Sequence, residues 1–241
     1  MSQKTSGFIL HRFPFQDSDL ILKCFTEDQG ILSVLAKGAK RSKMPGYFEP
    51  FCRVNIEFFG QADLKKLRSI EPKQMTHPGF RLSNNRLYSA FYLNELLTYL
   101  IPASFSSELN LSCLFQAYEN TLLKLSDETF NLEPVLRDFE ITLFKTLGLW
   151  PDLSRDDLGN EIVPENFYDL QAESAARLSP SGDFQGEDLL NIAAHCWSDK
   201  KTRSAAKRLL RHWISFYAEG KPFKSRECFI YPSKALGIFD T

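Results

Sequence analysis

The sequence contains no run of about 18 uncharged apolar residues, the length that a membrane-spanning helix requires. Its start is polar, and the short apolar run Phe8-Ile9-Leu10 is followed at once by His11 and Arg12, so the apolar region of a signal peptide does not form. We therefore expect a cytoplasmic protein with no membrane partner.

Motifs of common catalytic centres are also missing. The chain has no GxxxxGKS/T phosphate loop, no GxGxxG after a strand, no HExxH and no GxSxG. The acidic pairs Asp17/Asp19 and Asp156/Asp157 lie in expected loops, where a metal for nuclease chemistry would need supporting ligands that the spacing does not supply. We expect no enzyme, and a metal-dependent nuclease is kept only as an alternative to test.

Cysteine pairs with the spacing of a zinc site are absent. The adjacent His195 and Cys196 are expected on a helix, where their side chains point in different directions. Odd in number and scattered singly, the cysteines fit reduced thiols used for packing better than a disulfide framework. We expect no metal, no cofactor and no disulfide. The five cysteines are Cys24, Cys52, Cys113, Cys196 and Cys228.

Of the 241 residues, 43% are hydrophobic and 24% are charged, which is the composition of an ordinary globular protein. The length leaves room for about two domains. The net charge of −1 hides a strong segregation. Residues 1–80 carry +4, residues 81–199 carry −12 and residues 200–241 carry +7. A basic front and a basic tail suit an anionic partner, although a solvated surface with no partner explains these charges about equally well.

Short β-rich runs separated by turn residues fill the first seventy residues or so. Gly30 can supply a positive φ after the second run, and residues 60–63 suit a short hairpin connection. Five short antiparallel strands at this spacing predict a small closed barrel, which leaves no exposed sheet edge. The expected strands are 7–13, 20–26, 31–36, 51–59 and 64–70.

Beyond residue 78 the apolar period becomes helical. Residues 150–186, rich in proline and glycine, are expected to form an irregular insertion with a short hairpin, and the tail over 221–241 is apolar enough to dock. We expect an α+β multidomain protein with a barrel domain over 1–78 and a helical domain over 79–241. The expected helices are 82–100, 108–125, 133–148, 187–197 and 202–218.

The segment 36–43 places four cations and a glycine in the loop after the third expected strand. Mobile Lys and Arg side chains at the mouth of a barrel bind the phosphates of single-stranded DNA by releasing counterions, largely independently of sequence. A solvated loop with no ligand remains the other interpretation. Cations of this loop and of neighbouring strands form the candidate DNA-binding set: Arg12, Lys37, Lys40, Arg41, Lys43, Lys65, Lys66 and Arg68.

Aromatic side chains interleave with these cations and could offer faces on which bases stack. Most of them are expected in the core, since a small barrel needs aromatic filling. They are Phe13, Phe15, Tyr47, Phe48 and Phe51.

A second basic stripe is expected on the helix over 202–218, where Lys207 and Arg211 lie one turn apart. It would meet phosphates or an acidic peptide, or would only complement the acidic middle of the chain. The cations at this end of the chain are Lys200, Lys201, Arg203, Lys207, Arg208 and Arg211.

Several further segments carry recognisable motifs. They are 7–15 (GFILHRFPF) followed by 17–20 (DSDL), 25–30 (FTEDQG), 36–41 (AKGAKR), 49–51 (EPF), 64–71 (LKKLRSIE), 92–97 (YLNELL), 137–140 (RDFE) leading to 147–149 (LGL), and 220–229 (GKPFKSRECF). In order and spacing these segments resemble the RecO family of bacterial recombination mediators, over nearly the whole chain except residues 155–200.

The resemblance implies an N-terminal five-stranded OB-fold barrel, a helical C-terminal domain and no catalytic centre. It also implies binding to single- and double-stranded DNA, annealing of complementary strands, and association with the nucleoid. Joint action with RecR would load RecA onto DNA coated by single-strand-binding protein, with the participation of RecF left open. Family members bind the acidic C-terminal tail of that coating protein on the helical domain, and the candidates for this partner site or a second DNA site are Arg137, Arg203, Lys207, Arg208 and Arg211.

One departure from the family concerns zinc. Many members hold zinc with four cysteines after the segment that corresponds to 149–151, but here no cysteine follows until Cys196. We therefore expect a zinc-free insertion. The main alternative function is an OB-fold module that binds protein or RNA without annealing DNA.

Overall fold

The computed structural model describes residues 2–73, 82, 84–101 and 111–230, with the backbone alone at residues 229 and 230. Two compact units form. The first comprises the described residues of Met1–Asp127 and Pro222–Thr241, and the second is Glu128–Lys221. These units are defined by contacts rather than by the change from strands to helices, so the expected boundary at residue 78 stays a prediction. The expected helix start at residue 108 and the tail over 231–241 lie outside the described residues.

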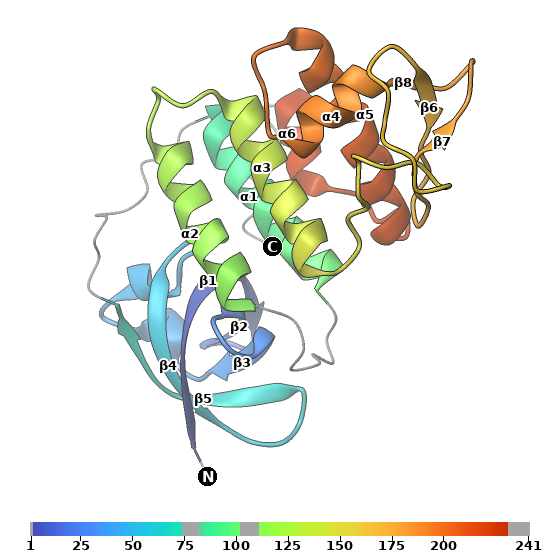
Figure 1. Ribbon diagram of the computed structural model, residues 1–241. Helices are drawn as coiled ribbons and strands as arrows, with labels where there is room; N and C mark the ends of the chain where they lie inside the picture. The colour runs from blue at the N-terminus through green and yellow to red at the C-terminus, as the bar shows by residue number, and fades with distance from the viewer. Residues whose placement is uncertain (1, 74–81, 83, 102–110, 231–241) are drawn as a thin grey trace. The chain divides into compact units, whose positions relative to one another are not determined.

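Five strands close into a barrel in the order β1-β2-β3-β5-β4 (Figure 1). All neighbouring pairs are antiparallel except β3 and β5, which are parallel. The closed barrel is confirmed, but β1 begins before the expected residue 7, because its first residues pair with β4. The strands are β1 (Gln3–Phe15), β2 (Asp19–Thr26), β3 (Gly30–Ala36), β4 (Arg53–Phe59) and β5 (Leu64–Pro72).

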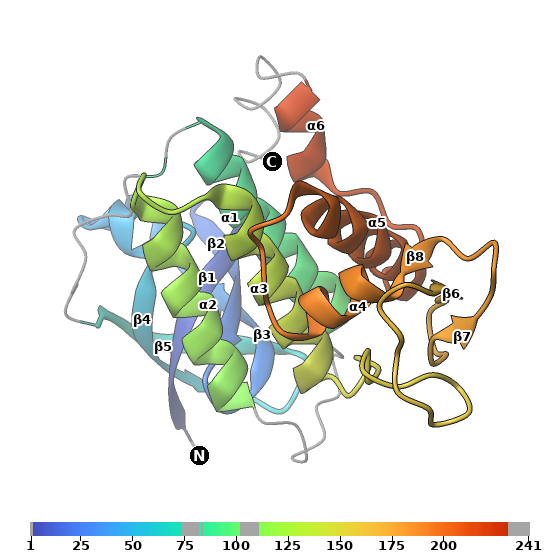
Figure 2. The ribbon, with the colours of Figure 1, turned by 45° about the horizontal axis from the view of Figure 1, so that its top comes forward.

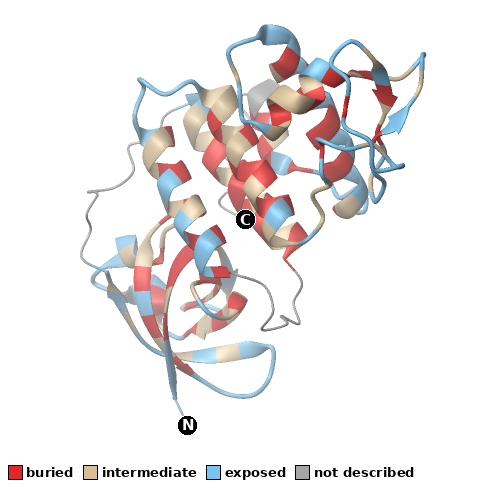
Figure 3. Cartoon of the chain, in the orientation of Figure 1, coloured by how far each residue is buried: buried red, intermediate tan, exposed pale blue. Residues whose placement is uncertain are grey.

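The barrel core follows from alternation along the strands. In β3, Leu32, Val34 and Ala36 are buried while the residues between them are partly exposed, as expected when side chains alternate across a sheet. Burying a Leu or Val side chain stabilises the fold by roughly 1.5–3 kcal/mol. In contrast, no residue of β5 is fully buried, and Figure 3 shows this strand in the colours of exposed and intermediate residues.

Two bulges alter the alternation in ways that bear on the surface. On β1, Leu10 is an extra residue, since Ile9 pairs with Cys24 and His11 pairs with Lys23. On β5, Arg68 is the extra residue, since Leu67 pairs with Phe58 and Ser69 pairs with Glu57. After an extra residue, each following side chain points to the opposite face of the sheet from the one that simple alternation predicts. Leu67 and Ile70 therefore both reach the core, while Arg68 and Ser69 stay exposed.

Helices α1 (Asn84–Leu100), α2 (Leu111–Ser126) and α6 (Lys224–Ile230) belong to the same unit as the barrel. Phe8 and Phe25 of the barrel pack against Phe115 and Tyr118 of α2, with ring centroids between 5.2 and 6.0 Å apart. The Arg53 guanidinium lies 5.7 Å from the Phe8 ring centroid and 5.3 Å from that of Phe115. A buried aromatic cluster therefore fixes α2 to the outer face of the barrel.

A buried polar network joins α1, α2 and β1. The Asn94 amide donates to the Leu10 carbonyl at 2.7 Å, and the Asn94 amide oxygen accepts from the Tyr118 hydroxyl at 2.6 Å. The bulge at Leu10 accompanies this contact on the strand side. Both the NH₂ group and the oxygen of the buried Asn94 amide are therefore hydrogen-bonded. This pairing specifies how α1 docks on the barrel.

The second unit contains α3 (Leu132–Thr146), α4 (Gly186–Ala193), α5 (Lys200–Tyr217) and a small sheet. The expected hairpin of the insertion is a three-stranded antiparallel sheet in the order β7-β6-β8, seen beside α4 in Figure 2. Its strands are β6 (Phe167–Asp169), β7 (Arg177–Leu178) and β8 (Phe184–Gln185). Trp213 forms the centre of this unit's core, edge-on to Phe144 at 5.8 Å and to Trp150 at 5.2 Å.

Helix α4 ends at Ala193, so the expectation that His195 and Cys196 lie on a helix is wrong. The chain leaves the helix through His195, whose φ of 55° is in the left-handed region common just after a helix end. None of the five cysteines, all of which the structure describes, is in a disulfide, and burial raises the pKa of the Cys24 thiol to about 12. A packing role therefore suits Cys24 and Cys228, which are buried, but it is wrong for Cys113 and Cys196, which are exposed. Within the described ranges, no helix has the length and apolar character to cross a bilayer.

Candidate nucleic-acid interface

The basic loop that follows β3, residues 37–43, is held in place by residues at the start of β2. Asp19, the first residue of β2, accepts the Gly38 backbone N–H at 2.8 Å, and the Lys40 N–H donates to the Ser18 carbonyl at 3.0 Å. Gly38 has a φ of 67°, a left-handed conformation that favours glycine, and a single 3-10 turn over Ala39–Arg41 follows it. The loop backbone is therefore fixed against the β1–β2 turn while its side chains extend outward.

Asp19 is buried, and three features of its surroundings hold the pKa of its carboxyl below the usual value. The hydrogen bond from the Gly38 N–H is the largest, and the Ser18 hydroxyl and the nearby lysines Lys37 and Lys40 add to it against the opposing effect of desolvation. The carboxylate therefore stays ionised and available as an acceptor. This gives a structural role to a residue that the sequence offered only as half of an acidic pair.

The four loop cations are exposed: Lys37, Lys40, Arg41 and Lys43. The Lys40 ammonium donates a hydrogen bond to the Gln16 carbonyl at 2.8 Å and forms no ion pair with the described residues. Over the described part of the chain, no carboxylate lies within ion-pair distance of Lys37, Arg41 or Lys43. Their charges are thus free to neutralise an external anion.

Below the loop, at the mouth of the barrel, lies a pocket of about 270 Å³. Arg12 lines it, but its guanidinium pairs with the Glu49 carboxylate at 2.6 Å, so a phosphate would have to compete with that carboxylate. The pocket has both charged and apolar walls, which suit a phosphate and an adjoining sugar. Its lining residues are Arg12, Pro14, Leu20, Ala39, Lys40, Pro45 and Phe48.

The cations of β5 extend this surface. Lys66 is exposed and lies opposite Leu35, two residues before the loop cation Lys37, so it continues the basic surface along the barrel wall. Arg68 is also exposed but pairs with Glu57 at 3.1 Å, and the Lys65 ammonium donates to the Gln61 carbonyl at 3.2 Å. Of the three β5 cations, Lys66 is therefore the one that combines exposure with no such contact.

The aromatic candidates separate clearly by exposure. Phe48 is buried in the barrel core, Phe51 is buried against Phe91 of α1, and Tyr47 and Phe15 are intermediate. Phe13 is 40% exposed. It is therefore the aromatic candidate with the most face to offer to a base.

On α5, only part of the expected stripe is available. Lys207 and Arg211 are exposed, one turn apart. Arg203 instead donates to the Trp197 and Ser198 carbonyls at 2.6 and 2.9 Å and lies 3.5 Å from Glu133. Arg208 is exposed too, but it donates to the Asp183 carbonyl at 2.6 Å and lies over the Phe184 ring at 5.1 Å.

Arg137, the remaining candidate of this set, is buried on α3. Its side chain is 10% exposed, and its guanidinium pairs with the fully buried Glu140 carboxylate at 2.8 Å. A contact with a partner would have to use that remaining tenth of its surface. The burial of Arg137 could not be predicted from the sequence, because an Arg and a Glu three residues apart on a helix have the same spacing whether the pair is buried or solvated.

Sequence reasoning also missed two residues on the outer face of β1 and β2. His11 stacks on Phe13 with ring centroids 4.2 Å apart and planes 16° apart. Lys23 lies directly opposite His11 on the neighbouring strand. Polar residues at these positions among apolar strand neighbours were the available signal, and it was overlooked.

Comparison with known proteins gives matches along the chain. The family model described as Recombination protein O N terminal matches residues 1–76, and the model described as Recombination protein O C terminal matches residues 81–227. A DNA repair protein RecO of Haemophilus influenzae (strain PittGG) is 39% identical over 234 residues, which cover 95% of this chain and 96% of its own. A DNA repair protein RecO of Pasteurella multocida (strain Pm70) is 37% identical over 229 residues, which cover 92% of each chain.

Proposed function

This chain belongs to the recombination protein O family of DNA repair proteins, and from that premise we propose that it binds single- and double-stranded DNA and anneals complementary strands. With RecR, it helps to load RecA onto DNA coated by single-strand-binding protein. The protein makes and breaks no bond in this role, and its place of action is the nucleoid in the cytoplasm. The observation that carries the proposal is the basic loop, whose cations are exposed while its backbone is pinned by Asp19.

The loop favours binding without sequence preference. Lysine and arginine side chains that neutralise phosphates release condensed counterions, and this gain does not depend on the bases. Lys66 and the pocket at the barrel mouth lengthen the surface along which a strand would run. Annealing then requires only that two strands be held close while their mutual repulsion is screened.

The exposed pair Lys207 and Arg211 on α5 is the proposed site for the acidic tail of the single-strand-binding protein or for a second strand. Two cations one helical turn apart, with no ion-pair partner in the part of the chain that the structure describes, suit carboxylates spaced along a short peptide. Arg203 and Arg208 border this site, and their side chains are already engaged by backbone carbonyls.

Annealing of complementary strands coated by the cognate single-strand-binding protein tests the proposal. The coat is used either intact or without its terminal tail residues. We expect the protein to accelerate annealing with the intact coat and to lose most of that effect without the tail. The variant Lys207→Ala/Arg211→Ala should lose the same part, whereas Lys200→Ala/Lys201→Ala, at the other end of α5, should retain it.

Other outcomes would contradict the proposal. If annealing is not accelerated with either coat, a module that binds protein or RNA becomes the better explanation. If labelled DNA is cleaved on incubation with magnesium, the proposal of a non-enzymatic role fails.

A further inference from the structure

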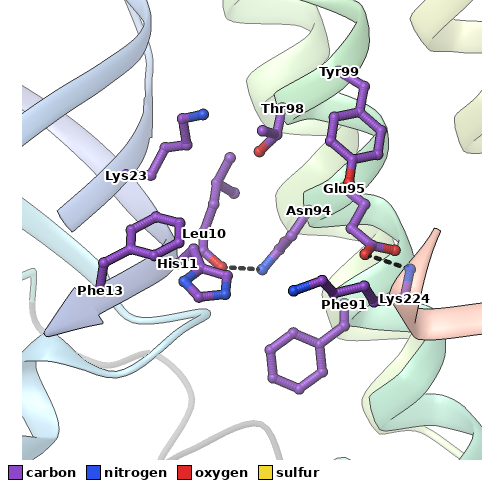
Figure 4. A pocket seen from close by; sticks show the side chains of 10 residues that line it. All are labelled: Leu10, His11, Phe13, Lys23, Phe91, Asn94, Glu95, Thr98, Tyr99 and Lys224. Carbon is purple, nitrogen blue, oxygen red and sulfur yellow. Dashed lines mark hydrogen bonds between the residues drawn. The ribbon is translucent and has the colours of Figure 1, made fainter. Parts of the chain in front are cut away.

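A second pocket, of about 260 Å³, lies between the outer face of the barrel and α1, with α6 at one side (Figure 4). All of its walls belong to the same compact unit. His11, Phe13 and Lys23 project from the strands, and Thr98 lies across from them on α1. The lining residues are Leu10, His11, Phe13, Lys23, Phe91, Asn94, Glu95, Thr98, Tyr99 and Lys224.

Strand geometry explains why these side chains meet. After the bulge at Leu10, His11 lies opposite Lys23, and Phe13 lies two residues further along the same face. The imidazole and the phenyl ring form a nearly parallel stack, with centroids 4.2 Å apart. Because Phe13 is 40% exposed, the stack is a flat aromatic platform with an open side.

The pocket also holds two lysines, Lys23 and Lys224, against one carboxylate, Glu95. Lys23 is half-buried, burial lowers the pKa of its ammonium, and it has no ion-pair partner in the described part of the protein. The exposed Lys224 is close enough to His11 to lower the pKa of that imidazole, after the larger effect of burial. A desolvated cation without a counter-ion costs stability, and an anion that enters the pocket would remove that cost.

The carboxylate in the pocket is already committed elsewhere. Glu95 accepts hydrogen bonds from the backbone N–H groups of Lys224 at 2.9 Å and Ser225 at 3.2 Å, and from the Ser225 hydroxyl. The Asn94 amide is likewise occupied by Leu10 and Tyr118. The groups left to meet a ligand are thus the aromatic platform, the Thr98 hydroxyl and the two lysines.

We propose that this pocket accepts one unstacked base of a single-stranded nucleic acid, stacked on the Phe13–His11 platform, with a flanking phosphate at Lys23 and Lys224. Every base has a flat π face, so such a platform binds bases with little sequence preference. The inference rests on the proposed DNA-binding function and adds to it a site on the opposite side of β1 from the basic loop.

The course of β1 favours a nucleic acid over other aromatic anions. Its residues alternate between the two pockets: His11 and Phe13 line this one, while Arg12 and Pro14 line the pocket at the barrel mouth beside Lys40. A ligand that repeats its charge along a chain can occupy both pockets across the strand. An acidic peptide that ends in an aromatic residue would fill only the pocket at α1, and it serves as the competing outcome in the test.

The test compares binding of a thymidine oligomer with binding of an abasic deoxyribose-phosphate oligomer of the same length. The unmodified protein should bind the thymidine oligomer about tenfold more tightly, since base stacking on an aromatic side chain contributes to affinity at each occupied site. Phe13→Ala should abolish most of that preference and leave abasic binding unchanged. Phe167→Ala is the matched control, because Phe167 is 44% exposed on β6, in the other compact unit and outside the pocket.

Lys23→Gln tests the phosphate contact. It should weaken binding of both oligomers several-fold, and it should raise the melting temperature of the free protein, because it removes a half-buried charge that has no ion pair. Lys4→Gln, on the same sheet but with a side chain that is 80% exposed, should leave both quantities unchanged.

Three results would overturn the inference. The first is an unchanged base preference in Phe13→Ala, and the second is unchanged oligomer affinity in Lys23→Gln. The third is an acidic peptide with a terminal aromatic residue that binds in a Phe13-dependent manner without displacing the oligomer. Failure of the proposed function would look different, since the unmodified protein would then bind neither oligomer.

Discussion

The side chain of Asp19 accepts the Gly38 backbone N–H at 2.8 Å, so the first residue of β2 determines where the basic loop begins. The carboxylate is buried, and the loop cations Lys37 and Lys40 lie near enough to favour its ionised form. The residue that orients the cations is therefore itself an anion placed beneath them. A surface that must attract phosphates can hold this negative charge because it is covered by the loop that it supports.

Asp19→Ala should reduce the affinity for single-stranded DNA several-fold, because the loop loses its anchor while all of its cations remain. Asp19→Asn should keep most of the affinity, since the amide oxygen can still accept the Gly38 N–H. Titration of a fluorescent oligonucleotide with both variants measures the difference. Equal losses in the two variants would show that the charge, not the hydrogen bond, positions the loop.

The same carboxylate makes a prediction about pH. Because the pKa of Asp19 is lowered in the folded state, first by the Gly38 N–H, its stabilising effect is present above the usual carboxyl pKa of 3.8 and is lost as the pH falls through the lower, folded value. The melting temperature of Asp19→Ala should thus lie below that of the unmodified protein near neutral pH and approach it in strong acid. A difference that stays constant with pH would contradict this assignment.

His11 should make the protein less stable in mild acid. Burial, together with Lys224, Lys23 and Arg12, lowers the pKa of this imidazole below 6.5, against the hydrogen bond to the Arg12 carbonyl. The unfolded chain therefore binds more protons than the folded one between the two pKa values, and stability decreases as the pH falls through that interval. His11→Gln should flatten this decrease in melting temperature.

Asn94→Ala should lower the free energy of unfolding by about 2 kcal/mol, because it removes the donor to the buried Leu10 carbonyl and the acceptor of the Tyr118 hydroxyl. Urea denaturation measures the change. Asn120→Ala, at an exposed position on α2, is the matched control and should stay within about 0.5 kcal/mol of the unmodified protein. An equally small effect at Asn94 would mean that water replaces the lost contacts.

Arg137→Ala should be more damaging, by about 3–5 kcal/mol, because it removes the guanidinium from the fully buried Glu140 carboxylate. Replacing both residues at once, as Arg137→Met/Glu140→Leu, should recover much of that loss. Urea denaturation of the single and double variants gives the comparison. A stable Arg137→Ala variant with reduced binding of the acidic tail would instead support the sequence-based assignment of Arg137 to the partner site.

The sequence predicted the five strands of the barrel because their cause is local: apolar alternation and turn residues recur every few positions. The bulges at Leu10 and Arg68 could not be predicted, because a bulge depends on the register of the neighbouring strand. The pocket that faces α1 depends on the first of these bulges. It was therefore beyond the reach of the sequence, although His11 and Lys23 stood out as polar residues in apolar strands.

The candidate cations show the same limit. The sequence could not separate Lys207, which is exposed, from Arg203, whose guanidinium donates to the carbonyls of Trp197 and Ser198. Contacts of this kind depend on where another segment of the chain passes. The placement of α1 and α2 with the barrel also follows from long-range packing, such as that of Phe8 on Phe115.

The central claim is that the loop cations bind the phosphates of single-stranded DNA, and the salt dependence of binding tests it most directly. Lys37→Ala/Arg41→Ala removes two exposed charges that form no ion pair with the residues that the structure describes. The matched control Lys4→Ala/Lys73→Ala removes two exposed charges elsewhere on the barrel. If both loop cations contact phosphates, the slope of log affinity against log salt should fall by about 1.4 in the loop variant, at about 0.7 per contact, and stay unchanged in the control. An unchanged slope in the loop variant would contradict the account.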